Sequence, residues 1–449
     1  MTPVLLIYPF FRPFPDFTIF RQPPLGVSYI AASLREAGHR VQLLDCTFLT
    51  RCEALVRARE ARARVVGIYS MAGMMEDSVR LARAMRGSCE LLLAGGPLPT
   101  CRPEVFLEDF DVVVLGEGEQ TVKEVLLAHE RGTDLRAVGG LALRDGGGTV
   151  RTAARRPVED LDALPFPARD LLPNGQYIRF GRRRFGRSMT TVMSTRGCPF
   201  ACEFCSNVIF GGSFRQRSPG NVLDEVQQAL GLGYDGISFA DDVFTLDRAR
   251  VTSLCEEIRR RGMRFPWECL GRVDAMDAAM ARDMKRAGCD RVFFGIESGN
   301  EQTLELMNKR ITTGQARGAV EAAREAGLRV GAFFILFYPG ETLERVLETL
   351  RFATSLPLDY LGLTMPYPLP GTALHERVRD RITRTWQPRD GMPTNRVLTF
   401  DADFSEARMR FGILKGHVQF EMRKRLGRLA DPLVKLFEKP TDLLLKLMR

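Results

Sequence analysis

The first 150 residues alternate short apolar runs with amphipathic stretches. The apolar runs lie at residues 4–8, 41–45, 65–70, 91–94 and 112–115, and each has the length of a strand. Helical spacing of apolar side chains occupies residues 25–37, 75–86 and 121–129. Because the strand-like runs do not alternate with polar residues, both faces of the sheet should be buried, which indicates parallel strands covered by helices. The pattern predicts a doubly wound, Rossmann-like α/β domain over residues 1–150.

A second series of strands and helices follows residue 188. Strand-like runs lie at residues 189–194, 237–240, 266–270, 291–296, 331–337 and 360–365. Helical patterns lie between them at residues 222–232, 247–261, 277–287, 315–326 and 343–355. These elements make roughly six strand–helix units, short of the eight that a closed barrel needs. We therefore expect residues 188–375 to form a second α/β domain.

The segments around these two domains have a different character. VGGLALRDGGGTVRT, from residue 138, predicts a hairpin with a glycine-rich turn. Four prolines between residues 157 and 173 exclude regular structure there and predict an interdomain linker over residues 151–187. Residues 376–449 are arginine-rich and mostly helical in pattern. Their last segment sets leucines among lysines, so it either packs on the barrel or lies on a membrane surface.

Composition and charge limit the function classes. Apolar residues make up 45% and charged residues 27% of the chain, as in ordinary globular proteins. There is no apolar run of about twenty residues, and the N-terminus lacks the basic flank of a signal peptide, so we expect a cytoplasmic protein. The net charge is +9, concentrated in residues 179–187 and at the C-terminus. Without an aromatic platform or a nucleic-acid motif, this charge indicates either a plain arginine-rich surface or an acidic or membrane-associated substrate.

Three closely spaced cysteines carry the most specific signal. The sequence TRGCPFACEFCS places Cys198, Cys202 and Cys205 in a CxxxCxxC spacing. Three thiolates leave one iron of a [4Fe–4S] cluster open to a substrate or cofactor. A zinc knuckle is the alternative, although it usually uses CxxC pairs, often with histidine. The remaining cysteines show no ligand spacing and are expected to be small core residues: Cys46, Cys52, Cys89, Cys101, Cys255, Cys269 and Cys289.

The cysteine motif and the stretches FADDVF, FFGIESGNEQTL and GAFFILFYPGET follow in the order of a known family. Together with the N-terminal region they resemble the cobalamin-associated branch of the radical S-adenosylmethionine superfamily, over roughly residues 1–375. The resemblance implies a partial (β/α)6 barrel, open on one side for a bulky substrate. It also implies that S-adenosylmethionine binds the open iron and is cleaved to an adenosyl radical. Contacts to it are expected from Asp241, Asp242, Arg272, Glu297, Ser298 and Pro339.

Some of these residues have alternative interpretations. Asp241 and Asp242 could instead cap a helix or supply charge to its first turn. For Arg272 the contact itself is the expectation, because its guanidinium could pair with a carboxylate in a forked geometry. Arg217 is matched in relatives by an arginine near the cluster, and a phosphate or surface role is left open.

The N-terminal pattern resembles a cobalamin-binding domain. PPLGVSYIAASLREAGHRV, GGPLPT and GEGEQT carry this resemblance. Ligands of doubly wound sheets bind outside the carboxyl ends of the strands. Cobalamin contacts are therefore expected at Pro9, Ser70, Gly95, Gly96, Gly116 and Glu117. A nucleotide-binding or purely structural domain is the alternative.

The four histidines stand outside any DxHxxG motif. Leu98 occupies a position where relatives often carry histidine. A bound corrinoid is therefore expected to have no histidine ligand below the cobalt, and a degenerate domain without cofactor is left open.

Three functions fit these observations. The leading one is an enzyme that uses a [4Fe–4S] cluster, S-adenosylmethionine and cobalamin to methylate an unactivated carbon of a bulky, apolar substrate. The second is a radical cyclase or carbon–carbon bond-forming enzyme, as in the anaerobic porphyrin-ester cyclase branch. The third, a non-catalytic iron–sulfur redox protein, is disfavoured because it would need no S-adenosylmethionine pocket.

The expected partners follow from the leading function. They are a small-molecule, lipid or pigment substrate and an electron donor such as flavodoxin or ferredoxin. We expect no nucleic-acid partner. Peripheral contact with the inner face of the membrane would suit a lipid or pigment substrate.

Overall fold

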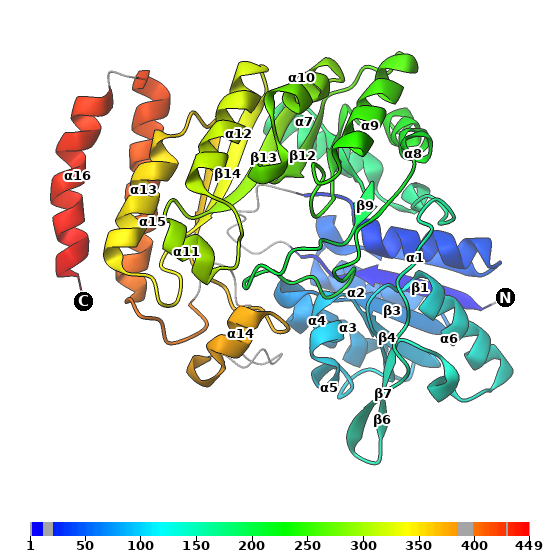
Figure 1. The fold of residues 1–449 in the computed structure, drawn as a ribbon. Coiled ribbons are helices and arrows are strands. Elements are labelled where there is room, and N and C mark those ends of the chain that lie inside the picture. The colour runs from blue at the N-terminus through cyan, green and yellow to red at the C-terminus, as the bar shows by residue number, and fades with distance from the viewer. Residues whose placement is uncertain (1, 12–20, 384–397, 428–429, 449) are drawn as a thin grey trace. The chain divides into compact units, whose positions relative to one another are not determined.

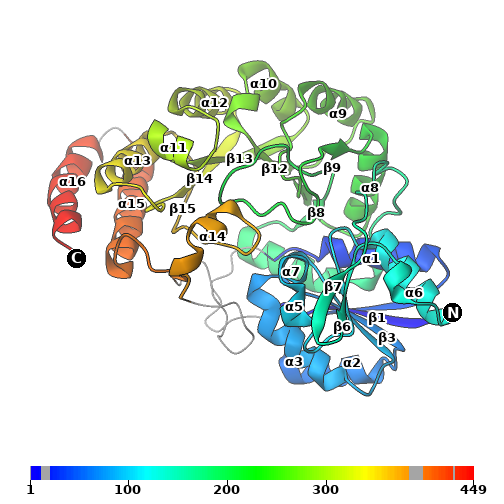
Figure 2. The same ribbon diagram turned by 60° about the horizontal axis from the view of Figure 1, so that its bottom comes forward.

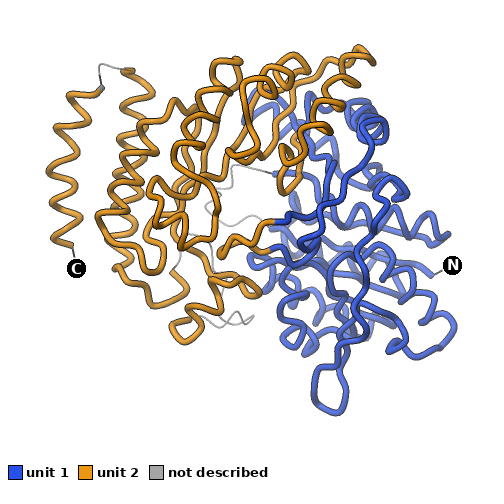
Figure 3. The backbone as a smooth tube through the Cα atoms, in the orientation of Figure 1, with its two compact units in different colours: residues 1–199, 207–237, 385–392 blue, residues 200–206, 238–384, 393–449 orange. Residues whose placement is uncertain are grey.

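The chain divides into two compact units, which Figure 3 colours separately. The computed structural model describes residues 2–11, 21–383, 398–427 and 430–448. Unit 1 comprises Met1–Pro199, Asn207–Ile237 and Thr385–Met392. Unit 2 comprises Phe200–Ser206, Ser238–Arg384 and Pro393–Arg449. The domain limits expected from the sequence remain a prediction.

Unit 1 contains a seven-stranded sheet in the order β2-β1-β3-β4-β5-β6-β7. The first five strands are parallel: β1 (Pro3–Tyr8), β2 (Arg40–Asp45), β3 (Val65–Tyr69), β4 (Leu91–Gly95) and β5 (Val112–Val114). The hairpin of β6 (Leu141–Asp145) and β7 (Gly148–Arg151) pairs antiparallel with β5. The predicted doubly wound fold is confirmed, and the predicted hairpin extends the same sheet.

Helices cover both faces of this sheet, because successive side chains of each buried strand point to opposite faces. Along β1, Leu5 and Ile7 belong to one hydrophobic cluster, while Val4 and Leu6 belong to another. Helices α2 (Arg51–Glu60) and α3 (Met75–Met85) pack on the first face. Helices α1 (Leu25–Glu36) and α6 (Glu119–Arg131) pack on the second (Figure 2). The short helices α4 (Pro97–Cys101) and α5 (Pro103–Phe106) follow β4.

The segment expected to be a linker contains helix α7 (Asn174–Phe185). Its start lies directly after Pro173, the last proline of the segment, and it ends at Gly186, which has a left-handed backbone with φ +74°. Only Tyr177 and Gly181 are buried along this helix. The apolar pattern is therefore too sparse to have revealed the helix from the sequence.

A second sheet of six strands has the order β15-β14-β13-β12-β11-β8. Its strands are β8 (Met189–Val192), β11 (Gly236–Phe239), β12 (Trp267–Gly271), β13 (Cys289–Glu297), β14 (Arg329–Ile335) and β15 (Tyr360–Thr364). The pairs from β12 to β15 are parallel (Figure 1). Because β8 and β15 stand at opposite ends of the order, the sheet is open, which confirms the expected partial barrel.

The helices between these strands match the predicted ones. They are α8 (Pro219–Gly231), α9 (Arg248–Arg260), α10 (Ala278–Arg286), α12 (Thr313–Glu325) and α13 (Leu343–Ser355). Helix α11 (Glu301–Leu306) was not expected from the sequence. A short two-stranded ladder pairs β9 (Thr195–Arg196) with β10 (Arg215–Gln216) and brackets the loop that contains all three cysteines of the motif.

The described part of the C-terminal region is mostly helical, as expected. Its helices are α14 (Ala373–Arg377), α15 (Glu406–Leu426) and α16 (Ala430–Leu447). Residues 384–397 lie outside the described part. In the segments that are described, none of the helices combines the length and apolar character needed to cross a membrane.

Candidate active site

The cysteine motif lies in a loop that begins directly after β9. Gly197 has φ +86°, and a Cβ at this position would lie 2.1 Å from the carbonyl oxygen of Ser213. Only glycine can therefore occupy this turn. Cys198 donates its N–H to the carbonyl of Gly211 at 3.3 Å, and Asn207 Nδ2 donates to the carbonyl of Cys198 at 3.0 Å. The backbone before the first thiol is thus fixed by bonds within unit 1.

The other two cysteines of the motif belong to unit 2. Cys205 donates its N–H to the carbonyl of Cys202 at 3.1 Å, which forms a tight turn. All three thiols of the motif are at least partly exposed, in contrast to the buried Cys255. No three His, Cys, Asp or Glu side chains of the described residues converge as they would around a single metal ion. In a cuboidal cluster each thiolate binds a different iron, so the three thiols need not meet at one point. Three exposed cysteines on the loop that begins at Gly197 are compatible with such a cluster.

The cysteines outside the motif mostly behave as expected. Cys46, Cys255, Cys269 and Cys289 are buried, and Cys89 and Cys101 are half-buried. The prediction is wrong for Cys52, which is exposed. Cys52 lies in the first turn of α2, a helix whose buried residues are Ala54 and Ala58, so its position faces away from the core.

Glu203, between the second and third cysteines, anchors the loop to unit 2. Its N–H donates to the carbonyl of Met307 at 2.9 Å, and its own carbonyl accepts from the N–H of Leu374 at 2.8 Å. Its carboxylate accepts from the Tyr338 hydroxyl at 2.7 Å and from Arg377 Nη1 at 2.8 Å. This residue was not expected from the sequence, because nothing in a loop sequence distinguishes an anchoring carboxylate from a solvated one.

Arg272 lies at the end of β12, and its guanidinium is already engaged within the protein. It stacks on the ring of Phe200 with 3.5 Å between its Cζ and the ring centroid. Its Nε and Nη2 donate to the two carboxylate oxygens of Asp274, each at 2.9 Å. The predicted forked pair therefore exists, but with a protein carboxylate. Arg272 Nη2 also donates to the carbonyl of Lys309 at 3.2 Å.

Glu297 forms a buried ion pair at the end of β13. Its carboxylate accepts from Lys309 Nζ at 3.2 Å, and both side chains are buried. The backbone of Glu297 has φ +71° at a bulge in the strand, a conformation that costs energy for a residue with a side chain. Strain of this kind is found where a chain aims a side chain at a ligand. Lys309 was missed because it stands beside Arg310 in a polar segment that resembles a surface turn.

The remaining predicted S-adenosylmethionine contacts differ in their surroundings. Ser298 is buried, and its hydroxyl pairs with Thr349 Oγ1 at 2.8 Å. Asp241 is buried with Arg250 Nη2 at 3.7 Å, whereas Asp242 is exposed. Pro339 is buried, and its carbonyl accepts from Arg377 Nη2 at 2.9 Å. Their roles toward S-adenosylmethionine remain predictions.

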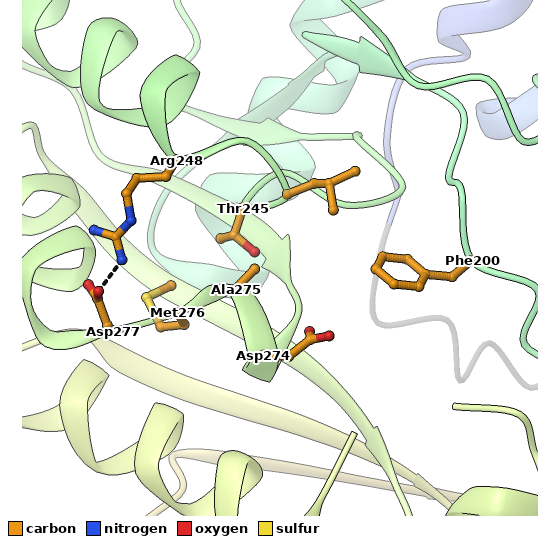
Figure 4. Close-up of a pocket in the computed structure, with 8 residues that line it drawn as sticks. Phe200, Thr245, Arg248, Asp274, Ala275, Met276 and Asp277 are labelled. Atoms are coloured by element: carbon orange, nitrogen blue, oxygen red, sulfur yellow. Dashed lines mark hydrogen bonds and ion pairs between the residues drawn. The ribbon is translucent and has the colours of Figure 1, made fainter. Parts of the chain in front are cut away.

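A cavity of about 360 Å³ opens beside Phe200 in unit 2 (Figure 4). Its wall also includes Thr245, Leu246, Arg248, Asp274, Ala275, Met276 and Asp277, and Arg248 pairs with Asp277 on the side away from Phe200. A volume of this size is within the range of small-molecule sites. The six predicted S-adenosylmethionine contacts do not line it.

All six predicted cobalamin contacts lie at the carboxyl ends of β1, β3, β4 and β5, with Gly95 as the last residue of β4 and the other five in the loops that follow. These strands are neighbours in the sheet, so their loops share one edge. Ser70 donates its N–H to the carbonyl of Gly95 at 2.8 Å, and a Cβ on Gly96 would lie 2.5 Å from the carbonyl oxygen of Ser70. This packing within the protein explains why position 96 is glycine. Pro9 follows β1, and Gly116 follows β5.

Glu117 is the exception among these residues, because its carboxylate is already satisfied. It accepts from Arg215 Nη1 at 2.8 Å, from Arg196 Nη1 at 3.2 Å and from the N–H of Val158 at 2.6 Å. Arg196 also donates to Glu119 at 2.7 Å. Glu117 therefore links the loop after β5 to residues on both sides of the first cysteine.

A second buried ionic group contains Arg217. Its Nη1 pairs with Glu225, which also accepts from Arg169 Nη2 at 2.5 Å and from the Tyr29 hydroxyl at 3.2 Å. All four side chains are buried. The surface role left open for Arg217 is wrong, because its side chain is buried. Its partner could not be predicted, since the amphipathic pattern of α8 does not show that the polar residue Glu225 faces inward.

The two histidines of unit 1 lie away from the strand ends that carry the predicted cobalamin contacts. His39 immediately precedes β2, and His129 pairs with Glu90, which immediately precedes β4. Both therefore mark the amino edge of the sheet. The absence of a histidine ligand to cobalt remains a prediction.

Glu341 of the PGET stretch gives a prediction for the pH dependence of stability. Burial raises the pKa of its carboxyl from 4.5 to about 7, although the Tyr338 N–H and the Thr303 hydroxyl donate to it at 3.0 and 3.1 Å. Between these pKa values the folded chain keeps a proton that the unfolded chain has lost, so the free energy of unfolding should fall as pH rises through this window. The loss should be roughly 3 kcal/mol.

The variant Glu341→Gln should remove this part of the slope, because its amide does not titrate. Urea unfolding of the wild type and the variant at several pH values across the window would measure it. An unchanged slope in the variant would show that another group is responsible.

Comparisons with known proteins agree with this geometry. Residues 192–353 match the model of the radical SAM superfamily, and residues 20–126 match that of the B12 binding domain. The chain is 35% identical over 364 residues to an uncharacterized methyltransferase of Pyrococcus horikoshii. The aligned region covers 79% of this chain and 78% of that protein. It is 28% identical to the anaerobic magnesium-protoporphyrin IX monomethyl ester cyclase of Cereibacter sphaeroides, over 80% of this chain and 61% of the cyclase.

A solved structure shares the fold. The radical S-adenosylmethionine methyltransferase TsrM from Kitasatospora setae, with cobalamin and a [4Fe–4S] cluster bound, superposes with a TM-score of 0.72. The match covers 85% of this chain and 75% of TsrM at 20% identity. The likeness extends over most of the chain.

Proposed function

Because this chain belongs to the radical SAM superfamily and carries a B12 binding domain, we propose that it methylates an unactivated carbon of a bulky, apolar molecule. It is a cobalamin-dependent radical S-adenosylmethionine enzyme, and its cofactors are a [4Fe–4S] cluster, S-adenosylmethionine and cobalamin. When bound, these groups supply a carbon-centred radical and a transferable methyl group. The observation that carries the proposal is the presence of both modules, a three-cysteine loop and a glycine-lined sheet edge, in one chain.

The chain's own residues would hold these groups as follows. Cys198, Cys202 and Cys205 would ligate the cluster, and the open iron would receive the amino and carboxylate groups of S-adenosylmethionine. The Glu297–Lys309 pair supplies one charge of each sign beside the loop, since Lys309 Nζ lies 5.8 Å from the ring centroid of Phe204. A fixed pair of opposite charges suits S-adenosylmethionine, which carries both an ammonium and a carboxylate group. Glu297 could pair with the ammonium group and Lys309 with the carboxylate group in place of their bond to each other.

The substrate class is proposed from the open barrel and from the relatives. A sheet that does not close leaves room for a large molecule, and one relative is named for a porphyrin ester. We propose a lipid-like or pigment-like small molecule. The reaction also needs a reductant for the cluster, and we propose flavodoxin or ferredoxin in the cytoplasm. Contact with the inner face of the membrane would bring the enzyme to an apolar substrate.

The cyclase relative supports a second candidate function. A radical cyclase of this family would join carbons of its substrate without adding a methyl group. The two candidates differ in product mass, because methylation adds one CH2 unit and a dehydrogenating cyclisation removes two hydrogens. They share the same cofactors, so cofactor content does not separate them.

Incubation with S-adenosylmethionine labelled in its methyl group should place label in the product. The reduced enzyme, loaded with cluster and cobalamin, would be tested on apolar candidate substrates, and the product mass would be measured. A matched reaction with cobalamin omitted should form no labelled product. Release of 5′-deoxyadenosine with an unlabelled product that has lost hydrogens would favour the cyclase.

A further inference from the structure

Helix α16 has one face that packs on the protein. It lies beside α15, and Val434 and Leu445 of this face are buried (Figure 1). The acidic side chains of this side are paired with the body of unit 2. Asp442 accepts from Arg351 at 2.8 Å and from the buried Lys415 at 2.7 Å, and Glu438 pairs with Arg351.

The opposite face of α16 presents a row of leucines to solvent. Their side chains are between 46% and 74% exposed: Leu433, Leu436, Leu443, Leu444 and Leu447. At about 100° per residue, these positions fall within an arc of roughly 100° on the helix surface. The exposed Pro440 lies inside the same arc. A continuous apolar strip of this kind is unusual on a monomeric surface and indicates an interaction site.

Lysines line one edge of the leucine strip. Lys435, Lys439 and Lys446 are exposed and share one side of the helix, between the leucines and the paired acids. The order around the helix is therefore acids against the protein, then lysines, then leucines. Asp431, at the start of the helix, lies 3.7 Å from Arg423. The charges that border the strip are accordingly positive.

We propose that the leucine face of α16 docks the enzyme on an anionic lipid surface. Leucines would enter the acyl boundary, while the neighbouring lysines would pair with the headgroups, as in interfacial amphipathic helices. A second copy of the chain fits this face less well. Antiparallel pairing of two such faces would bring lysines of like charge together along one edge of the seam, whereas an anionic surface complements them in any orientation.

Vesicle binding by the full chain tests this proposal. The wild type should bind phosphatidylcholine vesicles that contain phosphatidylserine, and should bind pure phosphatidylcholine weakly. The double variant Leu436→Ser, Leu447→Ser should bind at least about tenfold more weakly, because less apolar surface is buried on docking. The variant Lys435→Gln, Lys439→Gln, Lys446→Gln should lose about a hundredfold in affinity for the anionic vesicles and most of its salt dependence.

The control replaces apolar side chains of similar exposure elsewhere. Val56→Ser with Leu127→Ser alters exposed positions on α2 and α6, and should leave vesicle binding unchanged. All replaced side chains are exposed, so the melting temperatures of the variants should match the wild type, and this would be measured first. Equal binding to neutral and anionic vesicles, or none, would overturn the proposal.

Self-association would overturn the proposal as well. If sedimentation showed a dimer that the leucine variant abolishes, while vesicles were ignored, the face would join two copies. The proposal goes beyond the proposed chemistry, and vesicle binding needs no turnover. Its failure would therefore leave the labelled-methyl experiment unaffected, and the reverse also holds.

Discussion

Alanine at Cys202 is expected to abolish cleavage of S-adenosylmethionine and to remove nearly all of the iron that the wild type binds after anaerobic reconstitution. In the wild type, three thiolates bind three of the four irons and leave the fourth open. In the variant only two irons would have a protein ligand, which is too few to hold the cluster. The same result is expected for Cys198→Ala and Cys205→Ala. Iron analysis should fall from about four per chain toward zero, and formation of 5′-deoxyadenosine should become undetectable.

Cys52→Ala is the matched control for these variants. Cys52 is exposed and stands outside the motif, so its loss removes an exposed thiol without touching the loop. It should keep the iron content and the cleavage activity of the wild type. A Cys202→Ala protein that retained both would contradict the assignment of the cluster ligands.

The sheets could be predicted from the sequence because their strands are buried on both faces. The parallel strands β1, β3, β4 and β5 then appear as largely continuous apolar runs, and β1 shows why, since its neighbouring side chains enter two different clusters. The order β2-β1-β3 could not be read in the same way, because pairing depends on contacts between residues that are distant in sequence. Helix α7 was missed because few of its residues are buried.

The candidate site was predicted in part, and the limit is physical. Spacing alone identified the three cysteines, because ligands of one cluster must lie close together in a loop. Charged groups such as Lys309 and Glu203 act through partners that the fold brings together, and their neighbours in sequence carry no trace of those partners. For Arg272 the kind of interaction was predicted, a forked pair with a carboxylate. Its partner in the structure, Asp274, was not predicted.

Glu225→Gln is expected to destabilise the folded chain by about 3–5 kcal/mol. Glu225 is fully buried and accepts from two buried arginines, Arg169 and Arg217, and from the hydroxyl of Tyr29. The amide would remove the charge while leaving both guanidinium groups away from water, and an uncompensated buried charge is costly. Burial and the neighbouring Glu225 carboxylate also raise the pKa of Tyr29, so this phenol remains a neutral donor. Urea unfolding of the wild type and the variant would measure the loss.

Asp170→Asn provides the comparison that makes this prediction specific. Asp170 also pairs with an arginine, Arg35, at 2.8 Å, but both side chains are largely exposed. Water can take over the interactions of an exposed pair, so its loss should cost under about 1 kcal/mol. A small effect at both positions would mean that the group around Glu225 is hydrated in solution. A large effect only at Glu225 would establish that this buried carboxylate holds Tyr29 of α1 to Arg169 and Arg217.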